Sequence, residues 1–147
     1  MTINPLAIIP KYESSNCTDN HTSLSTSSGC FGFLDSSWKT YAGGAGVDTT
    51  KYPSAADAPT SVQFAVAAYT INKNGLKDWT CTGCDAKFVD YVNSHGGTSN
   101  FTTSGLSTNP ADYSSLDTTA GRSAFLASSG LAGLEPMEVS HSATARP

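Results

Sequence analysis

The chain has 147 residues, of which 38% are hydrophobic and 14% are charged, so it fits one domain with a hydrophobic core and is not a wholly disordered charged chain. The 12 acidic and 8 basic residues give a net charge of -4, which offers no basic face for nucleic acid. No apolar run approaches the roughly 18 residues that a membrane-spanning helix needs. We therefore expect no nucleic-acid partner and no membrane span.

The composition changes near residue 95. All four cysteines and both tryptophans precede this point, whereas residues 96–147 are rich in glycine, serine and threonine. We predict a folded domain at residues 1–95. Residues 96–147 are predicted to form an extended, low-complexity arm, with a short docked helix at 119–130.

The first predicted helix begins after Asn4, a favourable N-cap residue, and has Pro5 in its first turn. Glu13 shares the apolar face of this helix. Asp35 is expected to cap a second, short helix. The stretch between them is rich in turn residues, and we expect a small irregular β region near 22–34.

The third helix has the clearest signals, because Thr60 and Gln63 form a capping-box pattern before a long apolar run, and Gly75 supplies a stop. This helix is apolar all round, which predicts a central, buried position. Asp85 is expected to cap a last helix that ends near Gly96. The sequence therefore predicts an α+β domain that is mostly helical.

Glu13 is the strongest candidate for a chemical role. The chain contains three glutamates, and the other two, Glu135 and Glu138, lie in the arm. A carboxyl group held against apolar surface has its charged form disfavoured, which raises its pKa toward that of a general acid. The alternative is an ordinary glutamate at a helix end, turned to solvent.

Between residues 12 and 69 the chain carries a series of short motifs: Tyr-Glu-Ser-Ser-Asn (12–16), Ser-Gly-Cys-Phe-Gly-Phe (28–33), Asp-Ser-Ser-Trp (35–38), Ala-Gly-Val-Asp (45–48), Tyr-Pro (52–53), Ala-Pro (58–59) and Val-Ala-Ala-Tyr (66–69). Their order and spacing resemble the lysozyme-like lytic transglycosylase superfamily. They are most similar to the small transglycosylase-like domains of bacterial cell-wall proteins and phage particles, including the resuscitation-promoting-factor type. The resemblance covers about residues 4–82 and implies a lysozyme-like domain.

This resemblance implies cleavage of the β-1,4 bond between N-acetylmuramic acid and N-acetylglucosamine in peptidoglycan, with Glu13 as catalytic acid and base. The glutamate first protonates the leaving oxygen and then takes the proton of the muramic C6 hydroxyl, which closes an anhydro ring. The implied reaction needs no cofactor and no metal. The residues at the positions of the family's groove motifs are Ser14, Gly29, Phe31, Gly32, Phe33, Ser37, Trp38 and Tyr69. Core packing is the alternative role for Trp38 and Tyr69.

A hydrolytic glycosidase ordinarily uses two carboxylates. Asp35 and Asp19 are the candidates for a second one. We favour an N-cap role for Asp35, because the family pattern has a capping residue there. A single acid favours a lytic transglycosylase over a hydrolase.

The chain departs from the family at three positions beside the groove, one of which is Ser15, where glycine is common. Gly32 occupies the position of the groove glutamine, and Cys30 that of the first aromatic residue. These changes favour an alternative function, a non-catalytic structural or glycan-binding virion protein. The arm would then bind other virion or envelope-machine subunits, ordering only in the assembly.

Four cysteines allow three pairings. We predict Cys17–Cys30 and Cys81–Cys84, while a zinc site and free thiols stay open as alternatives. Disulfides imply an oxidising setting. The first residues show no basic segment followed by an apolar one, which predicts no secretory signal peptide. We therefore expect a virion protein of the tail or ejection apparatus that acts on peptidoglycan strands, or alternatively a protein of the periplasm or cell exterior.

Overall fold

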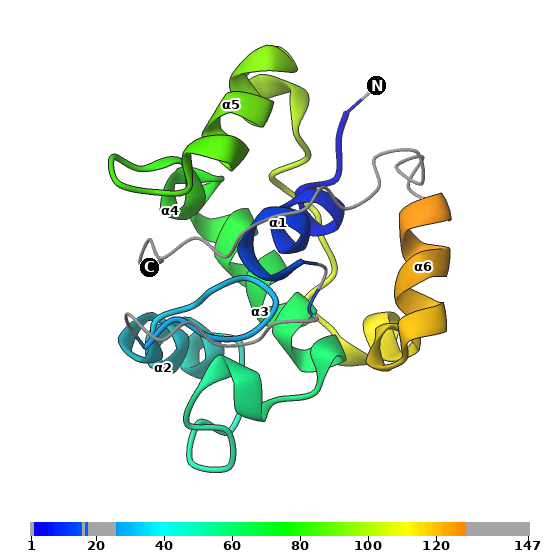
Figure 1. Ribbon diagram of the computed structural model, residues 1–147. Helices are drawn as coiled ribbons and strands as arrows, with labels where there is room; N and C mark the ends of the chain where they lie inside the picture. The colour runs from blue at the N-terminus through cyan, green and yellow to red at the C-terminus, as the bar shows by residue number, and fades with distance from the viewer. Residues whose placement is uncertain (1, 16, 18–25, 129–147) are drawn as a thin grey trace.

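The computed structural model describes residues 2–15, 17 and 26–128 (Figure 1). The regular structure in these residues is almost entirely helical, so the prediction of a mostly helical fold is confirmed. The elements in chain order are α1 (Pro5–Ser14), α2 (Asp35–Gly44), η1 (Ala55–Asp57), α3 (Thr60–Asn74), α4 (Lys77–Thr80), α5 (Ala86–Ser94), η2 (Thr98–Asn100), η3 (Pro110–Asp117) and α6 (Thr119–Ser128).

Helix α3 forms the centre of the fold. It runs behind α1 in Figure 1, with α2 beside one end and α6 on the other side of α1. Side chains on every face of α3 are buried, including Phe64, Ala67 and Ile71. The prediction that this all-round apolar helix lies in the interior is therefore confirmed.

Three helix ends form as their local sequence predicts. The side chain of Asn4 accepts the N–H of Leu6 at the start of α1, with an N···O distance of 3.0 Å. Asp85 caps α5 in the same way through the N–H of Lys87. Gly75 ends α3 with a φ of 70°, a left-handed conformation that glycine adopts readily.

Two predicted caps are wrong. Asp35 is the first residue of α2 rather than its N-cap, and its backbone N–H donates to Thr26 Oγ1. At α3 the side chain of Gln63 is turned into the core, so it forms no capping box. For Gln63 the cause is a contact with a distant residue, because its side chain accepts the N–H of Cys30.

Helix α3 receives its cap from the far end of the described chain. One carboxylate oxygen of Asp117 accepts the backbone N–H of Ser61 at 2.8 Å, and the other accepts the Ser61 hydroxyl at 3.2 Å. A carboxylate at a helix N-terminus satisfies free N–H groups and interacts favourably with the helix dipole. Asp117 thereby fastens η3 onto α3.

The expected β region near 22–34 is reduced to one antiparallel bridge between Ser28 and Phe33 among its described residues. A second, parallel bridge joins Ile3 to Phe101, with Ile3 donating its N–H to Asn100 O and accepting that of Thr102. The first bridge closes a short turn, whereas the second joins the amino-terminal segment to a remote part of the chain.

Residues 96–128 differ from the expected extended arm. Phe101, Tyr113 and Leu116 are buried and belong to the same hydrophobic core as α1 and α3. Helix α6 occupies Thr119–Ser128 and packs on η3. The low-complexity composition is misleading here because a few apolar residues suffice to dock the segment. The rest of the predicted arm, 129–147, lies outside the described residues.

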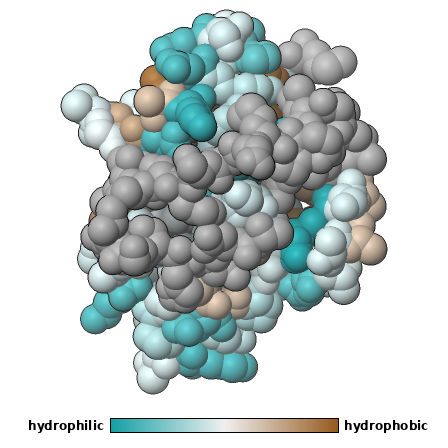
Figure 2. Space-filling model, viewed as in Figure 1, coloured by the Kyte–Doolittle hydropathy of each residue, from teal (hydrophilic) through white to brown (hydrophobic). Residues whose placement is uncertain are grey.

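No helix in the described part of the chain has the length and apolar character needed to cross a bilayer. In Figure 2 the described surface carries mostly polar side chains, notably over the end of the molecule where α5 lies.

Candidate active site

Glu13 lies in the last turn of α1. The residue is half-buried, and its Oε2 atom is buried. The helix ends one residue later, where Ser15 adopts a left-handed conformation with a φ of 50° and donates its N–H to Pro10 O. The candidate acid therefore lies at a helix terminus with one carboxyl oxygen held away from water.

Ser14 anchors this helix terminus to the following loop. Its hydroxyl oxygen lies 2.8 Å from Cys30 O and 3.1 Å from Pro10 O, and it accepts the N–H of Cys17 at 2.9 Å. The side chain is fully buried, so the Cys17 N–H that it accepts is shielded from water and needs this partner. The residue next to Glu13 is thus tied to both sides of the loop.

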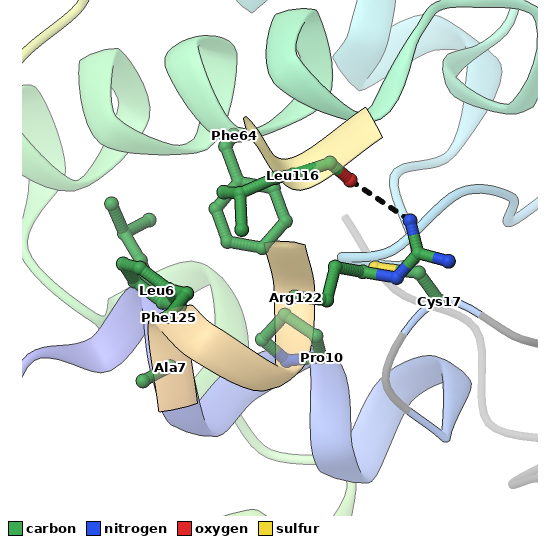
Figure 3. Close-up of a pocket in the computed structure, with 8 residues that line it drawn as sticks. All are labelled: Leu6, Ala7, Pro10, Cys17, Phe64, Leu116, Arg122 and Phe125. Atoms are coloured by element: carbon green, nitrogen blue, oxygen red, sulfur yellow. Dashed lines mark hydrogen bonds between the residues drawn. The ribbon is translucent and has the colours of Figure 1, made fainter. Parts of the chain in front are cut away.

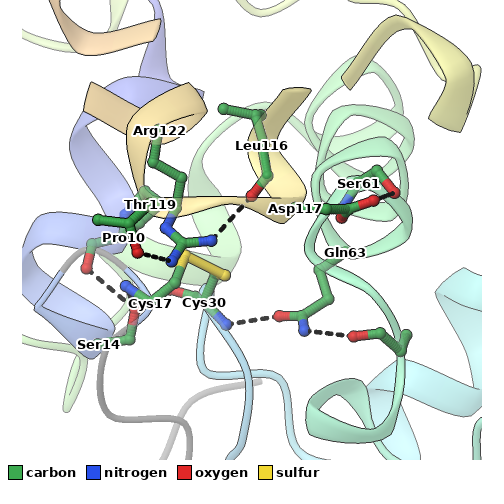
Figure 4. Close-up of a disulfide and its surroundings, with 11 residues drawn as sticks. Pro10, Ser14, Cys17, Cys30, Ser61, Gln63, Leu116, Asp117, Thr119 and Arg122 are labelled. Carbon is green, nitrogen blue, oxygen red and sulfur yellow. Dashed lines mark hydrogen bonds between the residues drawn. A yellow bond between two sulfur atoms is a disulfide. The ribbon is translucent and has the colours of Figure 1, made fainter. Parts of the chain in front are cut away.

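Cys17 and Cys30 form a disulfide, as predicted, directly beyond Ser14 (Figure 4). A bridge between positions 13 apart in sequence lowers the loop-closure entropy of the unfolded chain, worth about 3 kcal/mol. The second predicted disulfide, Cys81–Cys84, also forms, and its shorter separation of 3 corresponds to about 2 kcal/mol. All four cysteines are paired, so neither free thiols nor a zinc site remain.

Gln63 secures the other side of this disulfide. From α3 its Oε1 accepts the N–H of Cys30 at 2.6 Å, and its Nε2 donates to Ala58 O at 2.8 Å (Figure 4). Gly29 makes room for it, because a Cβ at this position would lie 2.6 Å from Oε1 of Gln63. This role of Gln63 was not predicted from the sequence. A lone amide within the apolar run of α3 is the signal that could have found it.

The groove residues expected from the resemblance lie mainly in the interior. Phe31, Phe33 and Trp38 are 0–1% exposed; Phe33 packs against the other two, and Phe31 and Phe33 both pack against Trp79. The indole N–H of Trp38 donates to Tyr52 O, which satisfies it within the core. Trp38 therefore has the core-packing role that was the alternative to lining a groove.

The remaining expected groove residues are spread over the fold. Gly32 is buried with a φ of 68°, and Ser37 is half-buried on α2. The half-buried Tyr69 lies against α2, because a Cβ on Gly44 would come within 2.5 Å of the Tyr69 hydroxyl. The structure thus brings Ser14 and Cys30 beside the end of α1, and directs Tyr69 toward Gly44.

Of the candidates for a second carboxylate, Asp35 is exposed at the start of α2, and Asp19 lies outside the described residues.

On its other side, α1 is held by α5. Tyr12 packs against Phe88 and Tyr91 with ring centroids 6.1 and 6.0 Å apart. Burial raises the pKa of the Tyr12 phenol, and the nearby Tyr91 and Asp85 raise it further. Tyr12 therefore stays neutral at physiological pH and acts as an apolar contact that fixes the end of α1.

A small apolar pocket lies on the opposite flank of α1, where Arg122 donates to Leu116 O at 2.8 Å (Figure 3). Its volume of about 20 Å³ is close to that of a single water site and far below that of a ligand pocket. The lining residues are Leu6, Ala7, Pro10, Cys17, Phe64, Leu116, Arg122 and Phe125. This pocket is a packing gap under α6 rather than a substrate site.

Among the described residues, no three His, Cys, Asp or Glu side chains are grouped so that they could hold a metal ion. Comparison of the chain with protein-family models, curated proteins and solved structures gives no significant match.

Proposed function

We propose that this protein is a lysozyme-like glycosidase that cleaves the bond between N-acetylmuramic acid and N-acetylglucosamine in peptidoglycan, with Glu13 as its single acid and base. The observation that carries the proposal is the placement of Glu13, half-buried at the end of α1 with Oε2 buried. Partial burial of a carboxyl group favours its protonated form, which a general acid requires.

The surroundings of Glu13 support this role because they fix the helix end. A catalytic acid must be held within hydrogen-bonding distance of the oxygen that it protonates. Ser14 ties the end of α1 to the Cys30 carbonyl, and the Cys17–Cys30 disulfide closes the loop that follows. Tyr12 holds the same helix from the side of α5. Such convergence is expected where one side chain must be positioned accurately.

The proposed reaction is lytic. Glu13 gives its proton to the glycosidic oxygen as the bond to the muramic C1 breaks. The carboxylate then takes the proton of the C6 hydroxyl as this oxygen attacks C1, which yields a 1,6-anhydro product and returns Glu13 to its protonated form. No water is consumed and one carboxylate is enough. The exposed position of Asp35 is compatible with this single-acid route.

A virion, the periplasm or the cell exterior is the proposed location. Disulfides persist in such oxidising settings, and the chain has two. Peptidoglycan strands are the proposed partner, and other virion or envelope-machine subunits are the proposed partners of the C-terminal residues.

The test is mass spectrometry of the soluble products released from purified peptidoglycan by the wild type, by Glu13→Gln and by Asp35→Asn. Glu13→Gln keeps the shape of the side chain but cannot donate an acidic proton, so we expect activity to fall about 100- to 10,000-fold. Asp35→Asn is the matched control, since it removes a carboxylate from an exposed position, and it should keep wild-type activity. Anhydromuropeptides from the wild type and from Asp35→Asn alone are the expected result.

Two other outcomes have clear meanings. Products with reducing ends would replace the lytic route with hydrolysis and return Asp35 or Asp19 to consideration as a second carboxylate. No products from a folded wild-type protein would overturn the catalytic proposal.

That last outcome would favour a non-catalytic, structural or glycan-binding virion protein. One observation supports this second candidate function: Phe31, Phe33 and Trp38 are buried in the core and do not line an open groove. Binding to insoluble peptidoglycan, measured by co-sedimentation with and without Glu13→Gln, distinguishes glycan binding from a purely structural role.

A further inference from the structure

The second disulfide lies in a very different environment from the first. Cys81 and Cys84 bracket Thr82 and Gly83 in the connection between α4 and α5, which loops outward at the left edge of Figure 1. Cys81 is exposed, whereas Cys84 is only 8% exposed. One sulfur-bearing residue therefore faces solvent while its partner is shielded by the protein.

The first disulfide has no exposed member. Cys30 is 0% and Cys17 is 8% exposed, and the backbone around them is held by Ser14 and Gln63. By contrast, Gly83 has a φ of 88° and open space around its Cβ position. An exposed disulfide is open to attack by a thiolate, whereas one buried in the core is not.

The structure already contains partners for Cys84 in its reduced form. The backbone N–H of Cys81 donates to Cys84 Sγ at 3.0 Å, which would stabilise a thiolate at this sulfur. Sγ also lies 3.5 Å from Asp78 O, which could accept the S–H of a neutral thiol. Both protonation states of a reduced Cys84 therefore have a hydrogen-bond partner nearby.

The helices on either side do not depend on the bridge for their positions. Trp79 of α4 is buried and donates its indole N–H to Phe31 O at 2.9 Å. Phe88 and Val92 bury one face of α5, and Asp85 caps its first turn. Opening the disulfide therefore leaves both helices anchored to the core.

We infer that Cys81–Cys84 is a redox-active disulfide that oxidises dithiols, with Cys81 as the sulfur that is attacked, while Cys17–Cys30 is structural. A thiolate of the dithiol bonds to Cys81 Sγ, and the Cys81–Cys84 bond breaks with its electron pair going to Cys84 Sγ. The second thiolate of the dithiol then bonds to the dithiol sulfur that is attached to Cys81, and the bond to Cys81 Sγ breaks with its electron pair going to Cys81 as a thiolate. The dithiol becomes a disulfide, and Cys81 and Cys84 gain two electrons and take up protons from water.

The first experiment treats the folded, full-length wild type with dithiothreitol, traps free thiols with N-ethylmaleimide over time, and maps them by peptide mass spectrometry. Cys81 and Cys84 should be labelled at least about tenfold faster than Cys17 and Cys30, because only the former bridge is accessible. Equal labelling of all four, or no labelling of Cys81 and Cys84 before the protein unfolds, would overturn the inference.

The second experiment tests which sulfur is attacked. Cys84→Ser leaves the Cys81 thiol and Cys81→Ser leaves the Cys84 thiol, and each reacts with 5,5′-dithiobis(2-nitrobenzoate). We expect the exposed Cys81 thiol to react about tenfold faster in the folded protein, and the two rates to converge in urea. A Cys84 thiol that reacts as fast as Cys81 in the folded state contradicts the assignment.

The third experiment measures the activity itself with a reduced peptide that contains two cysteines. The oxidised wild type should convert one equivalent of this dithiol to its disulfide, and the double variant Cys81→Ser/Cys84→Ser should convert none. That variant keeps Glu13 and the first disulfide, so any peptidoglycan cleavage is measured separately and can fail independently. A wild type that oxidises no more peptide than the double variant has no such activity.

Discussion

The hydroxyl oxygen of Ser14 lies 2.8 Å from the carbonyl oxygen of Cys30, and this contact joins the end of α1 to the loop that precedes α2. The same hydroxyl accepts the N–H of Cys17, so the Ser14 side chain contacts both disulfide-bonded residues. The position of Glu13 thus depends on a buried serine as well as on a covalent bridge.

Ser14→Ala should lower the free energy of unfolding by about 1–3 kcal/mol, because it leaves a buried N–H and a buried carbonyl without their partner. Urea unfolding measures the change. Thr40→Ala is the control, since the exposed Thr40 hydroxyl bonds to Ser36 O in its own helix, and it should cost less than about 0.5 kcal/mol. Equal effects of the two substitutions would show that the Ser14 contacts add nothing.

Gly29→Ala should destabilise the fold far more than Gly105→Ala. Both glycines have a left-handed φ, 80° and 73°, so both variants carry the backbone strain of about 1 kcal/mol. At Gly29 the new methyl group would also lie 2.6 Å from Gln63 Oε1 and 2.8 Å from Ala55 Cβ, whereas Gly105 has open space. We expect an additional loss of about 1–3 kcal/mol at Gly29 in urea unfolding.

Asp117→Ala should destabilise the protein by about 0.5–2 kcal/mol, since it removes the cap of α3. Asp90→Ala is the comparison, because Asp90 is a carboxylate on the exposed surface of α5, and it should change stability by less than about 0.5 kcal/mol. Thermal unfolding of both variants decides the point. A smaller loss for Asp117→Ala than for Asp90→Ala would contradict the capping role.

The stability of the protein should fall at alkaline pH through Tyr113. Burial, followed by the charge of Asp112, raises the pKa of Tyr113 to about 12, compared with about 10 in the unfolded chain. Between these values the unfolded chain loses this proton while the folded protein keeps it, so unfolding becomes easier as the pH rises from 10 to 12. The contribution of Tyr113 to this loss is about 1–2 kcal/mol.

Urea unfolding of the wild type and Tyr113→Phe at a series of alkaline pH values measures this contribution. The phenylalanine variant lacks the ionisable group and should show a shallower decline. It also loses the hydrogen bond from Tyr113 to Ser107 O, which lowers its stability by about 1 kcal/mol at neutral pH. Parallel curves for the two proteins would assign the alkaline loss to other groups.

Local signals were sufficient to predict much of the fold. Asn4 and Asp85 cap their helices, and Gly75 ends α3, because each acts on backbone groups within a few residues. The all-round apolar character of α3 likewise predicted its central position. These features depend on the nearby sequence alone.

The errors arise where distant residues compete for the same group. Gln63 accepts the N–H of Cys30 instead of capping its own helix, and Asp117 caps α3 in place of Thr60. Nothing in the sequence near α3 indicates a partner 56 positions away. Tertiary contacts of this kind override local propensity.

For the candidate site, the sequence predicted the position of Glu13 at a helix end and both disulfides, but it did not predict how the site is supported. The roles of Ser14 and Gln63 as anchors follow only from the meeting of α1, α3 and the loop at Cys30. Composition also concealed the packing of 96–128, since the buried Phe101, Tyr113 and Leu116 are few among many small polar residues.

The ties of Ile3 to Phe101 and of Ser61 to Asp117 have a consequence for the order in which the chain can fold. During synthesis Ile3 leaves the ribosome long before Phe101, and α3 emerges well before the Asp117 carboxylate that caps it. Such contacts between remote parts of the sequence slow folding, because a long loop must close before they form. The native core can therefore be completed only after residue 117 has been made, so a nascent chain that stops at residue 95 holds most of the hydrophobic residues but lacks the contacts that lock them in place.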